Sequence, residues 1–307
     1  MNHEYQNGLV SVAIPAYKKE FLHHAIESVL AQSYSNFELI IINDNSPEDI
    51  DSIVETFCDK RIKYYKNDIN LGKKSIVLNW NKCLTYASGE FFTLLCDDDI
   101  MDPLFLSSMI SLSKKFLTCN VFRCRTKYYN SETKRYFGET KMWPLYENHE
   151  DFLKNKLLYN RKHNISEFLY RTKFINDIGG YIVFPIGYYS DDASILFFSQ
   201  FGGIVSSPDT LITFRKSLVN ITSCTKYNLK KVKAALAYYN WLERFIFKKQ
   251  IQYDINNKLD FDLYEYFITC RSLYDAMKIL FIIPHNVWNY KKKTIFLLNW
   301  FREHYLS

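Results

Sequence analysis

Three consecutive carboxylates, Asp97, Asp98 and Asp99, follow a run of apolar and β-prone residues over 91–95. Neighbouring like charges repel by about 1 kcal/mol at 4 Å in water and by several times more near a protein surface. A bound divalent cation removes that cost, and Mg²⁺ and Mn²⁺ prefer carboxylate oxygens and keep positions open for phosphates. The cluster therefore predicts a platform for a metal and a diphosphate. The alternative is an acidic turn that caps the next helix.

Two further acidic positions stand at expected turns. Asp44 lies in the polar segment 43–46, while Asp191 and Asp192 come directly before a helix expected over 193–201. Each position has a purely structural alternative. Asp44 could serve the turn alone, and Asp191 or Asp192 could simply cap the helix.

Alternating strands and helices must position these residues. Nearly continuous apolar runs are typical of parallel strands buried on both faces, and apolar residues at helical spacing indicate amphipathic helices. Strands are expected at 9–14, 37–42, 61–66 and 91–95, and helices at 21–32, 48–57 and 73–87. The alternation predicts an α/β fold with a mainly parallel sheet flanked by helices. Ligands bind beyond the carboxyl ends of such strands, so 15–17, 44–46 and 97–99 should converge.

The pattern is less regular in the second half of the chain. Further elements are expected as a helix at 104–117, a strand at 121–125, a hairpin and loops over 127–164 with a helix at 151–158, a return to the sheet at 168–170 and a last strand at 210–215.

The composition changes beyond residue 226. Apolar residues occur at helical spacing from Val232 to Ile246, with basic residues around them that include Lys230, Lys231 and Lys233. Further helices are expected over 262–283 and 293–305. A basic amphipathic helix can lie on an anionic membrane surface, but packing on its own domain is the favoured interpretation. We expect two regions, a catalytic region 1–225 and a helical region 226–307 that associates with a membrane or a partner.

Composition narrows the class of protein. Hydrophobic residues make up 48% and charged residues 23%, as in a folded protein, and a dispersed net charge of +6 gives little support for a nucleic-acid partner. Seven cysteines without C-x-x-C spacing argue against a zinc site or a disulfide framework, and favour a reducing compartment. With no signal-peptide pattern and no stretch near ~18 apolar residues, we expect a cytoplasmic protein.

The common nucleotide-binding motifs are missing. No G-x-G-x-x-G follows the first strand, and no G-x-x-x-x-G-K-S/T occurs in the chain. The segment 15–19, Pro-Ala-Tyr-Lys-Lys, stands where glycines would hold a pyrophosphate. A metal on Asp97–Asp99 would hold a diphosphate differently.

Five segments in order resemble the inverting family-two glycosyltransferases of the GT-A fold. They are the strand ending in Pro15-Ala16-Tyr17, the helical segment 25–34, the segment 37–46, the helix end 81–90 and the Asp98-Asp99 element. The resemblance covers roughly residues 8–220. It implies a nucleotide-diphosphate-sugar donor, often a UDP-sugar, and Mn²⁺ or Mg²⁺.

The resemblance also implies roles for single residues. It places the donor nucleotide and diphosphate at Pro15, Ala16, Tyr17, Glu20, Asp44, Asp97, Asp98 and Arg215. Asp98 matches the carboxylate nearest the metal, and Asp99 lies close to the metal or the acceptor. Asp192 best fits the base that takes the acceptor's proton, with Asp191 on the acceptor side.

The chain departs from the family pattern in three places. Cys96 stands where Asp opens the common Asp-x-Asp-Asp pattern, Asn43 replaces the first of two acids, and Arg215 is followed by Lys216 and Ser217 instead of a histidine. These departures concern the metal and ribose ligands.

The leading hypothesis is a metal-dependent inverting glycosyltransferase that extends a bacterial surface polysaccharide or a lipid-linked glycan, with an anionic membrane surface as a further partner at the inner face of the plasma membrane. One alternative is a catalytically impaired nucleotide- or glycan-binding module, and another is a nucleotidyltransferase, which also needs a metal and a diphosphate. The sequence does not determine the oligomeric state.

Overall fold

The computed structural model describes residues 4–158, 162–217, 220, 224–247, 259, 262–264, 267–270 and 273–305. By its internal contacts the chain divides into two compact units. The first comprises residues 1–183 and 194–217, and the second comprises 184–193 and 218–307. Each unit is described by itself below.

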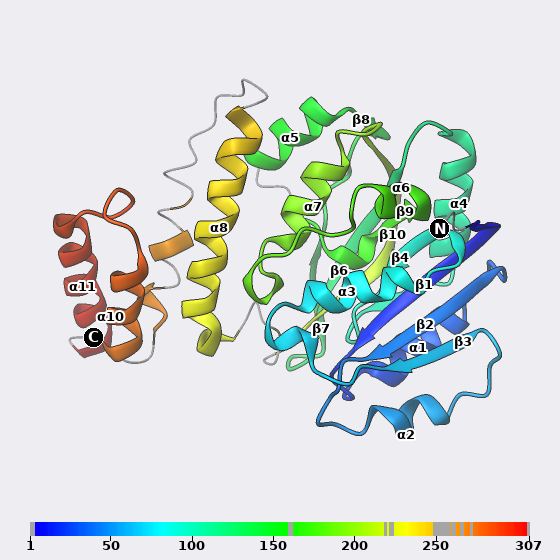
Figure 1. Cartoon of the computed structure of the whole chain (residues 1–307), viewed down its shortest axis with the longest axis horizontal. Helices are drawn as coiled ribbons and strands as arrows, with labels where there is room; N and C mark the ends of the chain where they lie inside the picture. Colours follow the sequence, from blue (N-terminus) through cyan, green and yellow to red (C-terminus); the bar gives the residue numbers. More distant parts are fainter. Residues whose placement is uncertain are drawn as a thin grey trace. The chain divides into compact units, whose positions relative to one another are not determined.

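The first unit is built on a ten-stranded mixed sheet (Figure 1). Eight strands follow the order β3-β2-β1-β4-β9-β6-β10-β5, with β7 paired to β6 and β8 to β10. The strands are β1 (Gln6–Ala16), β2 (Phe37–Asn43), β3 (Ile62–Lys66), β4 (Gly89–Leu94), β5 (Ile100–Met101), β6 (Val121–Asn130), β7 (Arg135–Glu139), β8 (Tyr146–Glu147), β9 (Phe168–Arg171) and β10 (Ile204–Lys216).

Strands β1 to β4 form the parallel half of the sheet. β1 pairs in parallel with both β2 and β4, and β2 pairs in parallel with β3. All seven residues of β2 are buried, as the apolar run predicts for a strand covered on both faces. Because these strands run in one direction, their carboxyl ends lie at one edge.

The remaining strands introduce antiparallel pairings. β9 lies between β4 and β6 and is antiparallel to both, whereas β6 and β10 pair in parallel. The short strand β5 pairs antiparallel with β10 through Met101 opposite Ile212, directly after the acidic segment. β10 is thereby brought beside the carboxyl end of β4.

Amphipathic helices cover the sheet. α1 buries Leu22, Ala25, Ile26 and Val29, and Asp49 caps α2 by accepting a hydrogen bond from the Ser52 amide. Figure 1 shows α3 on the near face of the sheet and α1 behind it. The helices of this unit are α1 (Leu22–Leu30), α2 (Ile50–Glu55), α3 (Ile76–Thr85), α4 (Phe105–Lys115), α5 (His149–Leu158) and α6 (Thr172–Asp177). Short 3₁₀ turns include η1 (Leu71–Lys73) and η2 (Ile165–Glu167).

The helix α7 (Ser190–Phe198) begins in the second unit and ends in the first. The second unit also contains η3 (Pro185–Gly187), η4 (Thr225–Tyr227), α8 (Asn228–Phe247), α10 (Leu273–Ile282) and α11 (Tyr290–Tyr305). Within this unit α8 packs against η3 and α10. No helix among the described residues has the length and apolar character needed to cross a membrane.

The apolar stripe of α8 is buried. Val232, Ala235, Tyr239 and Leu242 are at most 4% exposed, whereas Lys230, Lys233 and Arg244 are exposed. Lys231 differs from the expectation of a basic residue beside the stripe. It is only 4% exposed, and its Nζ lies 5.7 Å from the ring centre of Tyr188. Its four-carbon stem is apolar enough to be buried with the stripe.

The expected elements are present, with shifted boundaries. α7 begins at Ser190 instead of 193, so Asp191 and Asp192 stand in its first turn. β10 begins at Ile204 instead of 210, and β6 continues to Asn130 as one side of the expected hairpin. β5, β8 and α6 were not expected, because each is too short for a periodic pattern. Of the helix expected over 262–283, part lies outside the described residues.

Candidate active site

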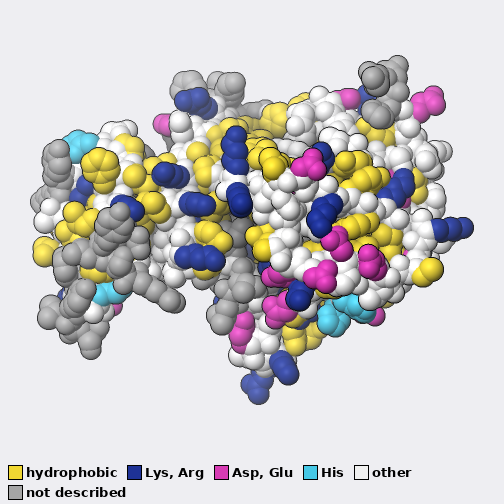
Figure 2. Space-filling view, turned by 60° about the horizontal axis from the view of Figure 1, so that its bottom comes forward, with side chains coloured by type: hydrophobic (Ala, Val, Ile, Leu, Met, Phe, Trp, Pro, Cys, Tyr) yellow, Lys and Arg dark blue, Asp and Glu magenta, His cyan; other side chains and the backbone are white. Residues whose placement is uncertain are grey.

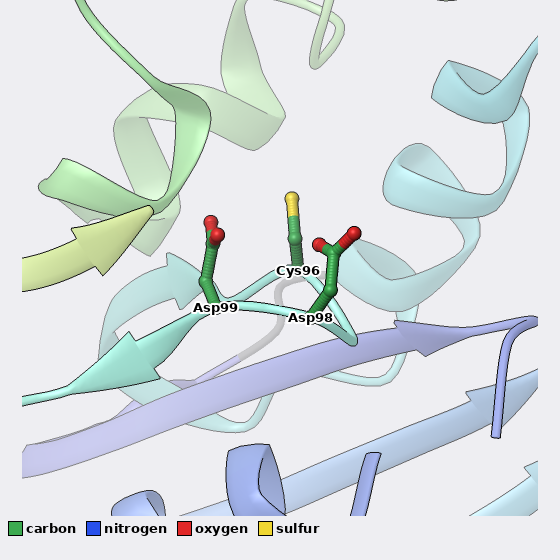
Figure 3. Close-up of side chains that lie close together, drawn as sticks. All are labelled: Cys96, Asp98 and Asp99. Atoms are coloured by element: carbon green, nitrogen blue, oxygen red, sulfur yellow. The ribbon is translucent and has the colours of Figure 1, made fainter. Parts of the chain in front are cut away.

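The acidic segment 97–99 forms a tight loop between β4 and β5. Figure 3 shows the side chains of Cys96, Asp98 and Asp99 rising from the same side of this loop. Their sulfur and carboxylate oxygens lie within 4.8 Å of one another. All three aspartates are buried, with exposed fractions of 6%, 7% and 1% in chain order. The repulsion between them must therefore be offset by donors and cations nearby.

Asp97 joins the acidic loop to the end of β1. Its Oδ2 accepts hydrogen bonds from the backbone amides of Tyr17 and Lys18, each at 2.8 Å. Burial raises the pKa of Asp97 to about 6, against the lowering effect of the Lys18 charge. The carboxylate fixes the backbone of the turn that follows the first strand.

Asp98 forms an ion pair with the ammonium group of Lys18. The Lys18 Nζ donates a hydrogen bond to Asp98 Oδ2 at 2.5 Å, and it lies 3.9 Å from Asp97 Oδ1. Burial alone would lower the pKa of Lys18, but the two carboxylates hold it above its usual range. Lys18 therefore keeps its positive charge.

Asp99 is held by residues of η2 and β10. Its Oδ2 accepts a hydrogen bond from Ser166 Oγ at 2.7 Å, and its Oδ1 accepts one from the Arg215 amide at 3.1 Å. Ser166 Oγ in turn accepts a hydrogen bond from the Cys96 amide. Burial, followed by the charge of Asp98, raises the pKa of Asp99 to about 8.

The Arg215 side chain is clamped beside the acidic loop. Its Nε donates to the Asp98 backbone oxygen at 3.1 Å. The guanidinium carbon lies 4.2 Å from the ring centre of Phe21 and 5.3 Å from that of Tyr129. Two aromatic faces and a carbonyl thus hold one permanent positive charge near Asp98.

The turns after β1 and β2 lie together, as predicted. The Asp44 amide donates to the Ala16 carbonyl at 2.9 Å, and Ser46 Oγ donates to the Tyr17 carbonyl at 2.5 Å. Pro15 is half-buried and lies opposite Ile42, so it does not end the strand as expected, and the pairing of β1 with β2 continues to Ala16 opposite Asn43. Tyr17 and Glu20 are exposed.

Asp44 organises a neighbouring loop. Its Oδ1 accepts from Asn67 Nδ2 and the Leu71 amide, and its Oδ2 accepts from the Gly72 amide at 2.8 Å. Asp44 therefore has a clear structural task. Its contact with a donor base stays a prediction.

A divalent metal fits the oxygens of the acidic loop. Asp98 and Asp99 offer two carboxylates within bridging distance, as hard cations require. Cys96 adds a sulfur, but burial raises the pKa of its thiol well above the usual value. Hard cations prefer oxygen to sulfur, so the two carboxylates are the better ligands. Asp97 is engaged by two backbone amides instead.

The second acidic pair belongs to the second unit. Asp191 and Asp192 occupy the first turn of α7, where negative charge is favoured. The turn before them contains left-handed backbone at Ile186 (φ 53°) and Tyr189 (φ 64°), which costs energy in residues other than glycine. Asp262 Oδ2 accepts hydrogen bonds from Tyr189 and Tyr239, at 2.6 and 2.8 Å, and so anchors this turn.

The structure brings most of the predicted donor-side residues together. Pro15, Ala16, Tyr17, Asp44, Asp97, Asp98, Asp99 and Arg215 lie at one edge of the sheet in the first unit, while Asp191 and Asp192 belong to the second unit. Figure 2 shows Asp and Glu side chains gathered on one part of the face in view, with Lys and Arg side chains among them.

Several contributors to the site were not predicted, among them Lys18, Phe21 and Ser166. Lys18 follows Tyr17 directly. Its position next to a turn expected to bind phosphate is the feature of the sequence that could have identified it. Phe21 was assigned only to the apolar face of a helix. Ser166 lies 67 residues from Asp99, and its local pattern predicts only a cap, since Asn164 and Glu167 form a capping box. Its approach to Asp99 depends on β9, whose pairing partners were not evident.

The mixed, mainly parallel sheet flanked by helices has the architecture of the GT-A fold. The chain belongs to glycosyl transferase family 2, whose family model matches residues 11–178. This membership confirms the family and the enzyme class expected from the sequence.

Relatives in bacterial glycan synthesis match part of the chain. The Escherichia coli K12 protein WcaA, whose name assigns it to colanic acid biosynthesis, is 35% identical in an alignment of 132 residues that covers 40% of this chain and 46% of WcaA. WfgD of Escherichia coli, named a UDP-Glc:α-D-GlcNAc-diphosphoundecaprenol β-1,3-glucosyltransferase, is 37% identical over 35% of this chain and 42% of its own length. The chain thus matches less than half the length of each relative.

Solved structures share the fold across nearly the whole chain. Staphylococcus aureus TarS 1–349 in complex with UDP-GlcNAc superposes with a TM-score of 0.59 at 17% identity, covering 91% of this chain and 82% of TarS 1–349. The mannosyltransferase PcManGT of Pyrobaculum calidifontis, with GDP-Man and Mn²⁺, has a TM-score of 0.53 at 12% identity, covering 96% and 86%. At these identities the likeness establishes the fold.

Proposed function

We propose that this glycosyltransferase moves a sugar, with inversion, from a nucleotide-diphosphate donor to a hydroxyl of a glycan or lipid-linked glycan in bacterial surface polysaccharide synthesis. The observation that carries the proposal is the meeting of the acidic loop 97–99 with the turn at Tyr17 and Lys18. A UDP-sugar is the favoured donor, since WfgD is named for UDP-Glc and TarS 1–349 was solved with UDP-GlcNAc. The acceptor class follows the names of WcaA and WfgD.

The donor side is assigned to the edge of the first unit. Asp98 and Asp99 would hold Mn²⁺ or Mg²⁺, which stabilises the negative charge of the departing diphosphate. Asp97 keeps the turn at Tyr17 in place, and the fixed charge of Arg215 favours phosphate nearby. Pro15, Ala16, Tyr17, Glu20 and Asp44 are assigned to the nucleotide.

The acceptor side is assigned to the acidic pair of α7 together with Asp99. Asp192 is the proposed base, which takes the proton of the acceptor hydroxyl as that oxygen attacks the anomeric carbon. The carbon–oxygen bond to the diphosphate breaks in the same displacement, so the anomeric configuration inverts. Asp191 is assigned to acceptor binding.

Two isosteric variants test this proposal. Asp98→Asn and Asp192→Asn should each lower the rate of sugar transfer by at least about 100-fold, because each removes a charge that the displacement requires. Transfer is measured with purified protein, a panel of nucleotide sugars and lipid-linked acceptors. Asp177→Asn is the control, since that side chain is 60% exposed and pairs only with Lys173 among the described contacts. Full transfer by either site variant would refute the mechanism.

The same assay separates the alternatives. A nucleotidyltransferase would release pyrophosphate instead of a nucleoside diphosphate. A binding module without activity would bind the nucleotide but release no product with Mn²⁺ present.

A further inference from the structure

The contacts of Asp98 differ in kind from those of its neighbours. The Lys18 ammonium lies 3.9 Å from Asp97, too far for a hydrogen bond, so the hydrogen bonds to Asp97 come from two backbone amides, and those to Asp99 come from a hydroxyl and a backbone amide. These are neutral donors on fixed elements. Asp98 instead holds the ammonium of Lys18 at 2.5 Å, a charge on a long and flexible side chain.

A divalent metal and this ammonium compete for the same oxygen. Metals such as Mg²⁺ bind carboxylate oxygen at about 2.0–2.1 Å. An ammonium that remained on Asp98 Oδ2 would then stand only a few ångströms from the metal, and cations so close repel each other strongly in a partly buried site. Metal binding through this oxygen therefore requires Lys18 to move.

The backbone of Lys18 can stay in place while its side chain moves. The Tyr17 and Lys18 amides are bound by Asp97, so the start of the side chain is fixed. The Lys18 side chain is 28% exposed, compared with 9% for that of Asp98, so it has solvent into which it can turn. A displaced Lys18 ammonium would remain near the turn at Tyr17 and Lys18, where we place the donor's diphosphate. The diphosphate is the most highly charged anion of the proposed reaction.

We propose that Lys18 is an exchangeable counter-cation of the acidic loop. It neutralises Asp98 in the donor-free protein, yields that oxygen to a divalent metal, and then binds the oxygens of a nucleoside diphosphate. The exchange with metal concerns the donor-free protein, and only the diphosphate contact rests on the proposed function. The Lys18 ammonium thus binds Asp98 in the donor-free protein and the nucleoside diphosphate once the metal has bound.

The first step is tested by metal binding without any donor. Mn²⁺ affinity of the donor-free full-length protein is measured by electron paramagnetic resonance or calorimetry. Lys18→Met should bind Mn²⁺ about ten-fold more tightly than the original protein, because the competing cation is gone. Lys18→Arg keeps a cation and should retain the original affinity or fall below it. Equal affinity in Lys18→Met and the original protein, or no Mn²⁺ binding by either, would overturn the exchange.

The second step is tested by UDP binding at saturating Mn²⁺. Lys18→Met should weaken UDP binding about ten-fold, since a direct cation–phosphate contact is lost, and Lys18→Arg should restore most of it. Unchanged UDP affinity in Lys18→Met would remove the diphosphate contact from the proposal.

Lys19→Met is the matched control for both measurements. Lys19 is exposed, and it is held through its backbone amide by Glu48. Both affinities should stay unchanged in that variant. Circular dichroism and Tm confirm folding, and Lys18→Gln gives a polar replacement should Lys18→Met fold poorly. Because neither measurement involves sugar transfer, failure of the exchange is distinguishable from failure of the proposed reaction.

Discussion

At the scale of residues, the acidic loop shows that three identical neighbours have three tasks. Asp97 organises the backbone after β1, Asp98 pairs with the Lys18 ammonium, and Asp99 is tied to Ser166 and β10. The sequence predicted the cluster and its place at a strand end. It could not predict the division of tasks, because the donors come from positions 17, 18, 166 and 215 and depend on the complete sheet.

A second buried carboxyl, Glu167, gives a pH dependence. Burial raises its pKa to about 7, although the Arg123 charge opposes this, and Thr126 Oγ1 donates to its Oε2. A carboxyl with a pKa above its unfolded value stabilises the fold below the unfolded pKa, and this contribution is lost as the pH rises through about 7.

Glu167→Gln should therefore remove part of the fall in Tm between pH 5 and pH 8. The effect on the free energy of unfolding should be on the order of 2–3 kcal/mol at pH 8 relative to pH 5. Thermal unfolding across this range, with Glu139→Gln as an exposed control, measures the difference. Parallel Tm curves for Glu167→Gln and the original protein would contradict the assignment.

At the scale of elements, the turn 184–189 is the least predictable part of the acceptor side. Tyrosines at 188 and 189 gave no periodic signal, and the left-handed backbone at Ile186 and Tyr189 contradicts their local preference. The turn is held by α8 and Asp262, which are far along the chain. By contrast, the parallel strands β1 to β4 and the helix α1 followed from their apolar patterns, since burial alone specifies them.

Tyr189→Phe should loosen the turn before Asp192 without unfolding the unit. One hydrogen bond to Asp262 is lost, which costs about 1 kcal/mol. We expect kcat for sugar transfer to fall about ten-fold with little change in KM for the donor.

Tyr239→Phe is the comparison for that variant. Tyr239 donates to the same Asp262 oxygen but lies on α8, outside the turn. It should lower Tm by a similar amount while kcat stays near the original value. Equal loss of kcat in both variants would indicate general destabilisation instead of positioning.

At the scale of the whole molecule, the chain joins an α/β unit to a helical one. The sequence predicted a compositional change near residue 226, and the contacts divide the chain at residue 217 and assign 184–193 to the helical unit. That assignment could not be read from the sequence, because it depends on which helices surround a short turn.

The exposed basic face of α8 is a candidate contact with an anionic membrane. Because the apolar stripe of α8 is buried, attraction would be electrostatic, about 1 kcal/mol per basic residue. Replacing Lys230, Lys233 and Arg244 by Gln should release the protein from phosphatidylglycerol vesicles in a sedimentation assay. Lys114→Gln with Lys115→Gln on α4 is the control, and unchanged partitioning of the triple variant would exclude the role.

The position of β9 also determines the order of folding. This strand of four residues lies between β4 and β6, yet it follows β4 by more than seventy positions and comes after β6 in the chain. During synthesis, the parallel half of the sheet and the β6 hairpin must wait with open strand edges until residues 168–171 emerge. Unpaired edges invite wrong pairing, and contacts between distant segments form slowly. The newly made protein should thus be most prone to aggregation in the interval between the synthesis of β4 and that of β9.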